Sequence, residues 1–368
     1  MTRLPSALAE AEESPQLAAP PALRLSVIIP ARNEAASLPA CLDSLVAQSE
    51  PGFALDAEWE LLVVDDDSTD ATRSLAEAAA AAHPGVLVLS APPLDLGPHR
   101  GFTGKTNTCW AAAQRARGQW LLFTDADTIH SPGDLSRAIH EAEKYHAALL
   151  SYSPRQVVTG FWQRVVMPLV FSELASVYPP RQVSDPASPL AAANGQFLLV
   201  ERDAYFSVGG HRAVGREVLE DVALALAIKR AHFGLRFRYA PEALATRMYR
   251  TLPEMIEGWT KNLALLFPSP VLLALWRILD VLLFFGLPIV ALALMGDLRP
   301  LWQPAVIWVL WLRTLFRFYH RVSRSHFPAV DVALSILGVP LFAWLLLRST
   351  LHTRLRRSVA WKGRTYTT

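Results

Sequence analysis

Charged residues and cysteines are scarce in this chain of 368 residues. Asp, Glu, Lys and Arg make up 18% of it and the mean hydropathy is +0.23, so the chain is too apolar for a comfortably soluble protein. Its two cysteines, Cys41 and Cys109, are too few and too separated for a metal site, and we expect both to be small buried hydrophobic residues. No recognisable nucleic-acid module is present. The net charge of +2 comes mostly from basic clusters near the carboxyl terminus, which suit an anionic membrane surface better than nucleic acid.

Four short apolar runs alternate with helical patterns in the first third of the chain. The runs cover residues 25–30, 60–64, 86–89 and 120–123. Helical patterns lie at residues 38–46 and 71–82, and polar residues follow several runs directly. Strands that alternate with helices form doubly wound sheets, which bind ligands outside the carboxyl ends of their strands. The sequence therefore predicts an α/β fold with a mostly parallel sheet and a site at that edge.

Asp125 and Asp127 come directly after the apolar run at residues 120–123. In an extended chain, side chains two residues apart point to the same side, so both carboxylates would leave the strand together. Mg²⁺ and Mn²⁺ prefer oxygen ligands, and Mg²⁺ is often held by one or two carboxylates with substrate phosphates completing its shell. The pair predicts a cation site for a nucleotide diphosphate. Two solvated turn aspartates are the alternative.

Four segments resemble the motifs of glycosyltransferase family 2 in their order and spacing. They are residues 27–34, 63–70, 124–127 and 219–221, and the resemblance covers roughly residues 25–262. It implies a GT-A fold, which is Rossmann-like, an inverting mechanism and a nucleotide-sugar donor. The chain would then be an enzyme, a hexosyltransferase.

The resemblance also implies which residues hold the donor and the cation. Asp125 and Asp127 would bind the cation, and Lys105 would contact the diphosphate. The other residues that it places in the donor site are Pro30, Ala31, Asn33, Glu34, Asp65, Asp66, Ala126, Asn194 and Gly195. Two alternatives without a role in catalysis stay open. Lys105 would be an exposed loop lysine, and Asn194 and Gly195 would form a turn before a strand.

Asp221, after Glu220, resembles the general base of the family. Such a base removes the acceptor hydroxyl proton as that hydroxyl attacks the anomeric carbon opposite the leaving group, which inverts the configuration. Burial beside a second carboxylate would raise its pKa toward working pH. The alternative is that both acids simply open a helix over residues 222–228, since acids in a first turn favour the helix dipole. Both can hold.

Three apolar blocks follow the predicted catalytic domain, residues 25–250, and an interfacial segment, residues 251–270. They are residues 271–295, 301–312 and 330–347, and they predict a helical membrane region. In the first block Arg277 and Asp280 are three residues apart, where they can pair on one helix face. A basic stripe follows the second block at Arg313, Arg317, Arg321 and Arg324.

This stripe indicates the cytoplasmic leaflet, with anionic inner-leaflet lipids as partners. The first helix would run outward and the second would return, leaving the catalytic domain in the cytoplasm of a bacterial-type cell as a multi-pass inner-membrane protein. Residues 1–24 lack a long apolar core and a cleavable-signal pattern, and we expect a flexible tail there, on the catalytic side.

The third block creates a conflict, because the tail after it, residues 348–368, is also basic. A re-entrant segment bent at Gly338 and Pro340 would leave this tail cytoplasmic, since each arm is too short to cross. A straight third span is the alternative. The tail resembles that of membrane-bound, lipid-directed family 2 enzymes, the hopanoid-associated and carotenoid (diaponeurosporenoate) glycosyltransferases. This implies that Trp361 and Arg364 contact diphosphate or lipid head groups, with an interfacial anchor as the alternative.

Related membrane enzymes carry a glutamine-x-x-arginine-tryptophan motif before their membrane segments. Here Trp259 stands at the matching place without the glutamine or arginine, and Lys261 lies two residues on. This departure argues against a processive, polymer-making role. Trp259 and Lys261 stay candidates for the acceptor or diphosphate pocket. The alternative for Trp259 is a place in the belt of aromatic residues at the membrane interface.

Residues 161–171 are apolar but too short to span a membrane, so we expect them to lie in the interface or to form a core helix.

The sequence thus predicts an inverting glycosyltransferase that depends on Mn²⁺ or Mg²⁺. It would move a sugar, glucose in our interpretation, from a UDP-sugar to a membrane lipid of terpenoid, carotenoid or sphingoid type. One alternative is transfer to a polyprenyl phosphate. Another, from a different class, is a catalytically silent membrane scaffold, although no metal aspartate and no base is missing.

Overall fold

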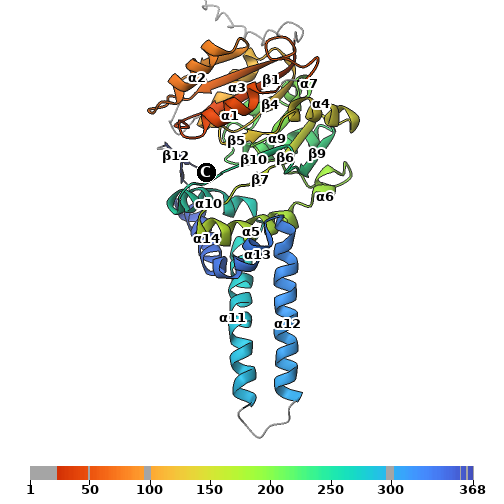
Figure 1. Ribbon diagram of the computed structural model, residues 1–368, viewed down its shortest axis with the longest axis vertical. Helices are drawn as coiled ribbons and strands as arrows, with labels where there is room; N and C mark the ends of the chain where they lie inside the picture. The colour runs from red at the N-terminus through yellow and green to blue at the C-terminus, as the bar shows by residue number, and fades with distance from the viewer. Residues whose placement is uncertain are drawn as a thin grey trace, which may run out of the picture.

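The protein consists of an α/β domain and a helical part from which two long helices project (Figure 1). The computed structural model describes residues 23–48, 50–94, 101–295, 302–356, 358–361 and 364–367. The predicted tail at residues 1–22, the connection at residues 296–301 and residues 362 and 363 lie outside the described residues.

A seven-stranded sheet forms the centre of the α/β domain, in the order β3-β2-β1-β4-β8-β6-β9. Only β8 runs against the others, since it pairs antiparallel with both β4 and β6, so the sheet is mostly parallel. The strands are β1 (Leu23–Ala31), β2 (Trp59–Asp65), β3 (Val86–Ser90), β4 (Gly118–Phe123), β6 (Leu149–Ser153), β8 (Leu198–Glu201) and β9 (Leu235–Tyr239).

Helices cover both faces of this sheet, which explains why its central strands are continuous apolar runs. Alternate residues of β1 illustrate this: Val27 packs in one core cluster and Ile28 in another. The first cluster also holds Cys41 and the second holds Cys109, so both cysteines are buried as predicted. The helices that contribute to the first cluster are α1 (Leu38–Val46), α2 (Thr72–Ala82) and α4 (Asp134–Lys144), and those of the second include α3 (Gly104–Arg115), α7 (Arg202–Ser207) and α9 (Glu220–Arg230).

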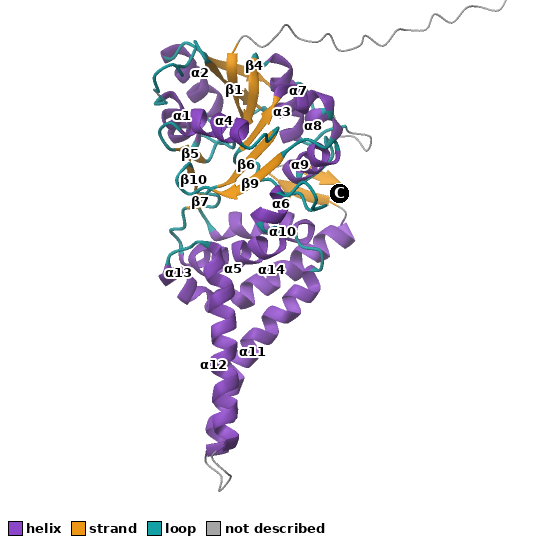
Figure 2. Ribbon diagram, turned by 90° about the vertical axis from the view of Figure 1, so that its right-hand side faces the viewer, coloured by secondary structure: helices purple, strands orange, loops and turns teal. Residues whose placement is uncertain are grey.

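A second, three-stranded sheet lies between the α/β domain and the helical part (Figure 2). It has the order β5-β10-β7, with β5 (Thr128–His130), β10 (Leu244–Thr246) and β7 (Arg155–Gln156). Because β5 follows the Asp125 and Asp127 loop directly, this sheet anchors one side of the predicted cation site.

The helical part is a layer beneath the α/β domain and a pair of projecting helices (Figures 1 and 2). The layer contains α5 (Phe161–Val177), α10 (Leu252–Leu266), α13 (Ala329–Leu334) and α14 (Val339–Leu351), packed around one apolar cluster. The projecting pair is α11 (Pro270–Met295) and α12 (Trp302–Val322). The predicted segment at residues 161–171 belongs to α5, where Phe161 is 51% exposed and Val165 is fully buried. Smaller elements are α6 (Pro180–Ser184), α8 (Gly210–Ala213), the hairpin β11 (Ser358–Trp361) and β12 (Arg364–Thr367), and helical turns at Ser323–Ser325, Ser335–Gly338 and His352–Arg356.

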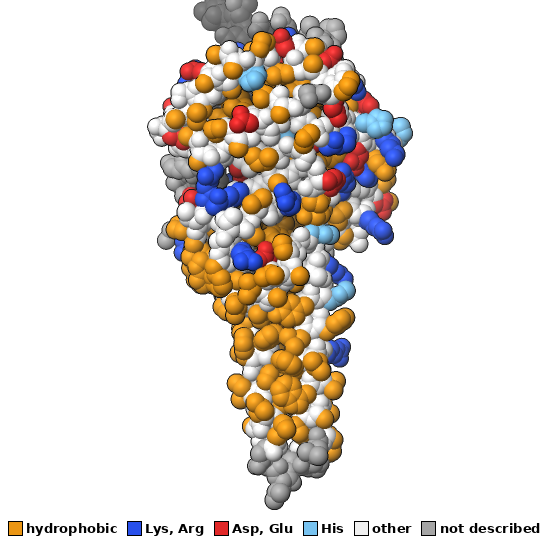
Figure 3. All heavy atoms as spheres, in the orientation of Figure 1, with side chains coloured by type: hydrophobic (Ala, Val, Ile, Leu, Met, Phe, Trp, Pro, Cys, Tyr) orange, Lys and Arg blue, Asp and Glu red, His pale blue; other side chains and the backbone are white. Residues whose placement is uncertain are grey.

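Two segments are long and apolar enough to cross a membrane, judged by length and composition among the described residues. They are Pro270–Met295 and Ala329–Arg354. The projecting helix α11 exposes large apolar side chains such as Leu282 and Ile289. On the face shown in Figure 3 the projecting pair is largely apolar, with basic side chains along one margin near the layer. These helices are consistent with a membrane region.

The third apolar block is not one straight helix. A 3₁₀ turn at Ser335–Gly338 separates α13 from α14 and includes Gly338, where the predicted bend at Gly338 and Pro340 begins. Helix α14 then packs against α10 and α11. The hairpin β11–β12 lies beside α10, so the carboxyl end is near the α/β domain (Figure 1). Re-entry into a membrane stays a prediction.

Four charged side chains join the projecting helices to the layer. Arg277 lies 3.0 Å from Asp280, which confirms the predicted pair, and 3.2 Å from Glu173 of α5. Arg321 of α12 contacts the same two acids, at 2.9 Å from Asp280 and 3.3 Å from Glu173. The two positive and two negative charges of these four side chains balance within this largely buried cluster.

We expect Gly338→Ala to destabilise the helical layer. A Cβ at Gly338 would lie 2.2 Å from the Val165 carbonyl oxygen, so α5 and the turn must separate. Such overpacking costs about 1–3 kcal/mol. Thermal unfolding in detergent should show a lower midpoint for this variant. Gly286→Ala is the matched control, because a Cβ there meets nothing within 4 Å; equal midpoints for both variants would contradict the prediction.

Candidate active site

The carboxyl ends of β1, β2 and β4 line a cavity of about 270 Å³, which α9 and α10 close from the other side. Most of the predicted donor-site residues lie in its wall. They are Pro30, Ala31, Glu34, Asp66, Lys105, Asp125, Ala126, Asp127, Asn194, Gly195, Glu220, Asp221 and Lys261. Segments far apart in sequence therefore meet at the sheet edge that the sequence predicts.

The Lys105 ammonium sits between two of the acids in this cavity. It lies 2.8 Å from Asp125 Oδ1 and 3.0 Å from Glu220 Oε1. Burial alone would lower its pKa, but Asp125 and Glu220 outweigh this and raise the pKa of Lys105 well above its ordinary value. The lysine therefore stays charged and compensates both carboxylates.

Asp221 is held at the start of α9 by two backbone amides. Gly195 N donates to its Oδ2 at 2.7 Å and Val222 N donates to its Oδ1 at 2.8 Å. Burial and the neighbouring Glu220 carboxylate together raise the pKa of Asp221 to about 6. Burial also raises the pKa of Glu220, but Lys105 and Lys261 reverse this and hold it below its ordinary value. The neighbouring acids thus differ: near neutral pH Asp221 is poised to accept a proton and Glu220 is charged.

Gly195 lies in close contact with two charged side chains of this site, so a larger residue would require Lys105 to shift. A Cβ at this position would be 2.8 Å from Lys105 Nζ and 3.4 Å from Asp221 Oδ2. The missing side chain lets the backbone N–H reach the Asp221 carboxylate while the lysine passes beside it.

Two predicted donor residues do not line the cavity. Asn33 has a positive φ of 52°, and its side chain accepts a hydrogen bond from Thr69 N at 2.8 Å, so it ties two loops together. Asp65 is the last residue of β2 and accepts from Ser68 N at 3.3 Å. Both residues shape the loops that carry Glu34 and Asp66 into the cavity.

Several cavity residues were not singled out by the sequence. Arg32 donates to the carbonyl of Asp67 at 2.9 Å and also to that of Asp66. Met248, Tyr249 and Asn262 come from the chain after β10 and from α10. Of these residues, only Arg32 could have been predicted from the sequence, since it lies within the predicted loop. The others come after β10, a strand of three residues that is too short to show a periodic pattern.

A second cavity of about 700 Å³ lies between the α/β domain and the helical layer. Its wall is largely apolar, and Trp259 lies there rather than in the first cavity. Asp221 borders both cavities. So do Asn194, Leu219, Met248 and Asn262. The side chains of Trp361 and Arg364 lie outside the described residues, so their predicted contacts stay predictions.

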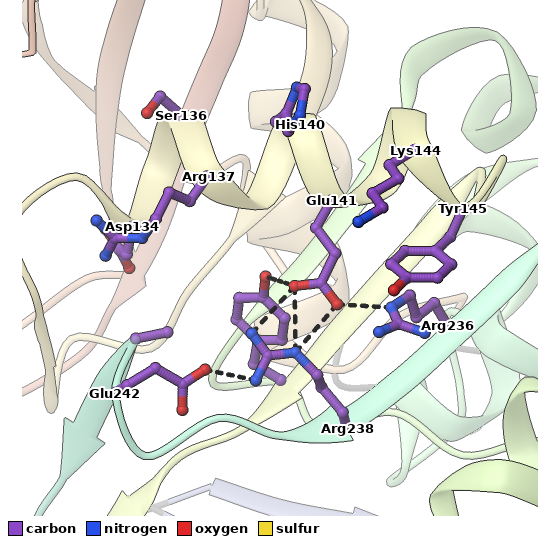
Figure 4. Close-up of a pocket in the computed structure, with 12 residues that line it drawn as sticks. Asp134, Ser136, Arg137, His140, Glu141, Lys144, Tyr145, Arg236, Arg238 and Glu242 are labelled. Carbon is purple, nitrogen blue, oxygen red and sulfur yellow. Dashed lines mark hydrogen bonds and ion pairs between the residues drawn. The ribbon is translucent and has the colours of Figure 1, made fainter.

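A third cavity, of about 670 Å³, shares no lining residue with the other two (Figure 4). At its centre Glu141 accepts from Arg236 at 2.6 Å, from Arg238 at 3.0 Å and from the Tyr152 hydroxyl at 2.7 Å. Its central carboxylate is thus compensated within the wall, and we do not place the site there.

The first cavity has the composition of a cation site completed by its ligand. Its wall holds six carboxylates (Glu34, Asp66, Asp125, Asp127, Glu220 and Asp221) and three cationic side chains (Arg32, Lys105 and Lys261). A diphosphate would be repelled by the surplus negative charge unless a cation entered with it. Within the described residues no group of three or more His, Cys, Asp or Glu side chains is arranged to hold a metal by itself. A cation held by Asp125 and Asp127 would therefore have to take further ligands from a phosphate.

Residues 26–205 match the sequence model of the family described as Glycosyl transferase family 2. This chain carries a family 2 glycosyltransferase domain. The enzyme is 27% identical over 356 residues to a 4,4'-diaponeurosporenoate glycosyltransferase of Staphylococcus haemolyticus, covering 93% of this chain and 88% of that one. It is 26% identical to the protein of the same name from Staphylococcus aureus (strain MRSA252), over 65% of this chain and 60% of that one.

The glycosyltransferase also has the predicted GT-A fold. Its structure is similar to that of the mannosyltransferase PcManGT from Pyrobaculum calidifontis, solved with GDP-Man and Mn²⁺. The TM-score is 0.53 and the identity 16%, with 94% of this chain and 92% of that one covered. At this identity the similarity carries the fold alone.

We expect Glu220→Gln to move the acid limb of the pH profile. Turnover that depends on ionised Asp221 falls as the pH drops through about 6. The Glu220 charge helps to raise the pKa of Asp221, so its removal lowers that pKa and shifts the limb to lower pH. The measurement is kcat/KM for sugar transfer against pH. Glu220→Asp, which keeps the charge, is the control; a limb that stays in place in Glu220→Gln would show that another group titrates.

Proposed function

We propose that the enzyme transfers a sugar from a UDP-sugar, glucose in our interpretation, to a lipid acceptor in a bacterial inner membrane. One observation carries the proposal: the Asp221 carboxylate borders both the acidic cavity and the large apolar cavity. A donor in the first and an acceptor in the second would meet at this carboxylate. No silent scaffold needs such a juxtaposition.

In the donor cavity, Asp66 and the chain at Pro30 and Ala31 would face the nucleoside, and Lys105 the diphosphate. Asp125 and Asp127 would hold Mn²⁺ or Mg²⁺. When bound, such a cation neutralises charge that develops on the departing diphosphate. Asn194 and Gly195, which line both the donor cavity and the path to Asp221, would lie beside the sugar.

Asp221 would act as the general base. Its ionised carboxylate accepts the proton of an acceptor hydroxyl, whose oxygen forms the new bond to the anomeric carbon. The bond from that carbon to the diphosphate oxygen breaks on the opposite face, so the configuration inverts. A carboxylate acceptor, already ionised, would need no such proton transfer. The two backbone amides keep the base aimed at the junction of the cavities.

The acceptor we propose has a long apolar chain, of terpenoid or carotenoid type. Phe171, Leu174, Trp259 and Phe327 supply the apolar wall that such a chain needs. The names of the two relatives support this acceptor class.

The apolar surface of α11 supports insertion of α11 and α12 as a hairpin. Three exposed arginines of the stripe, Arg313, Arg317 and Arg324, would face anionic inner-leaflet lipids with the α/β domain cytoplasmic, whereas Arg321 pairs with Asp280 and Glu173.

Detergent-purified enzyme with added membrane-lipid extract tests the proposal through UDP release from a panel of UDP-sugars. We expect turnover that needs Mn²⁺ or Mg²⁺ and is lost in Asp127→Ala. Asp221→Asn should lower transfer to a hydroxyl acceptor by about 10²- to 10⁴-fold while retaining UDP-sugar binding. The proposal would fail if no UDP-sugar bound, or if chelation of the cation left turnover unchanged.

Filling the apolar cavity separates acceptor binding from donor binding. Ala175 of α5 lines the cavity, so Ala175→Phe should raise the KM for the lipid acceptor by roughly tenfold or more, through lost space for the chain. The KM for UDP-sugar should stay unchanged. Ser176→Phe is the matched control, because its neighbour Ser176 does not line the cavity. Equal acceptor KM values in the two variants would remove this cavity from the proposal.

A further inference from the structure

A buried polar network lies directly behind the loop at residues 125–127. Its six side chains come from the residue that follows β4, from β5, from α4, from the loop before β8 and from β10. None is more than 4% exposed; they are Thr124, Thr128, His130, Asp134, Gln196 and Thr246. The catalytic assignment above uses none of them.

Two threonines of this network hold the backbone of the loop. The Thr128 hydroxyl donates to the Asp125 carbonyl at 2.7 Å, and the Thr246 hydroxyl donates to the Asp127 carbonyl at 3.3 Å. The carbonyls of the two candidate cation ligands are thus each fixed by a buried hydroxyl. The direction of both carboxylates depends on these carbonyl positions.

The same network reaches the loop that supports Asp221. The Thr124 hydroxyl donates to the Gln196 carbonyl at 2.8 Å, and Gln196 Nε2 donates to Thr246 Oγ1 at 3.1 Å. Gln196 follows Gly195, whose amide holds the base. One set of contacts therefore joins the cation loop to the loop beneath the base.

His130 connects the threonines to a buried acid. Its Nε2 lies 3.1 Å from Thr124 Oγ1 and 3.3 Å from Thr128 Oγ1. A neutral imidazole carries one N–H, so the ring donates on one side and accepts on the other, as its tautomer sets. On the other side Nδ1 lies 2.8 Å from Asp134 Oδ2. Asp134 Oδ1 is buried without a hydrogen-bond partner in the described part of the chain, so the ring is the main contact that orients this acid.

We propose that His130 and Asp134 form a positioning dyad that holds, through Thr124 and Thr128, the 125–127 loop in its cation-binding geometry. This inference rests on the proposed function. A purely structural role offers a simpler account, since Asp134 also stands in the first turn of α4, where an acid favours the helix dipole. However, helix stability does not need a chain of hydrogen bonds that ends on the carbonyls of both cation ligands. Groups that orient metal ligands in this way affect metal affinity.

Binding of Mn²⁺ in the presence of UDP tests the dyad without turnover. Electron paramagnetic resonance of free Mn²⁺ gives the half-saturating concentration for the detergent-purified full chain. Asp134→Asn and His130→Gln should raise it by roughly tenfold or more. Thr128→Val, which keeps the shape but removes the hydroxyl, should do the same, and Thr128→Ser should bind as the unaltered chain does.

Glu60→Gln is the control for general loss of stability. Glu60 is also buried and accepts from Ser26 at 2.6 Å and from Arg117 at 2.8 Å, but it lies near the opposite end of the sheet. The Glu60→Gln variant should have a lower midpoint of thermal unfolding and unchanged Mn²⁺ binding. The inference is overturned if the dyad and Thr128→Val variants lose stability but bind Mn²⁺ normally. A lack of Mn²⁺ binding by the unaltered chain with UDP would overturn the cation assignment as well, which distinguishes the two failures.

Discussion

A surplus of negative charge at one edge of the sheet is the constraint on which the rest of the site depends. Six carboxylates line one small cavity, and Lys105 alone contacts two of them. Because like charges repel strongly where water is partly excluded, each acid needs a cation, an amide or a proton. Glu220 is stabilised by the lysine, whereas Asp221 receives two backbone amides and a raised pKa. The same surplus makes the cavity unsuitable for a diphosphate without an accompanying cation.

The helical layer lines the candidate site as well as supporting the α/β domain. Helix α10 supplies Lys261 to the acidic cavity and Trp259 to the apolar one, and Asn262 borders both. The family match ends at residue 205, before Asp221 and before this helix. The part of the chain beyond the family domain therefore completes the site. Its ion pairs at Glu173 and Arg277 connect the projecting hairpin to α5, which itself lines the apolar cavity.

Differences between the predicted and the observed cavity wall have identifiable physical causes. Asp65 and Asp66 are adjacent, and consecutive side chains leave a strand in opposite directions, so only Asp66 faces the cavity. The pattern could not choose between them, because both follow the same apolar run. Tyr249 and Met248 were missed since β10 has only three residues and no periodicity marks so short a strand.

By itself, the sequence determined the alternation of strands and helices, the sheet edge that carries the site and the acids that gather there. These follow from local periodicity and from residue type, which act over short stretches of chain. Three properties follow from the tertiary structure alone. Lys105 compensates Asp125 and Glu220, the pKa of Asp221 is raised, and Asp221 borders two cavities. Those properties depend on burial and on distances between β4, α3, α9 and α10, and residues so far apart in the chain are brought together only by packing.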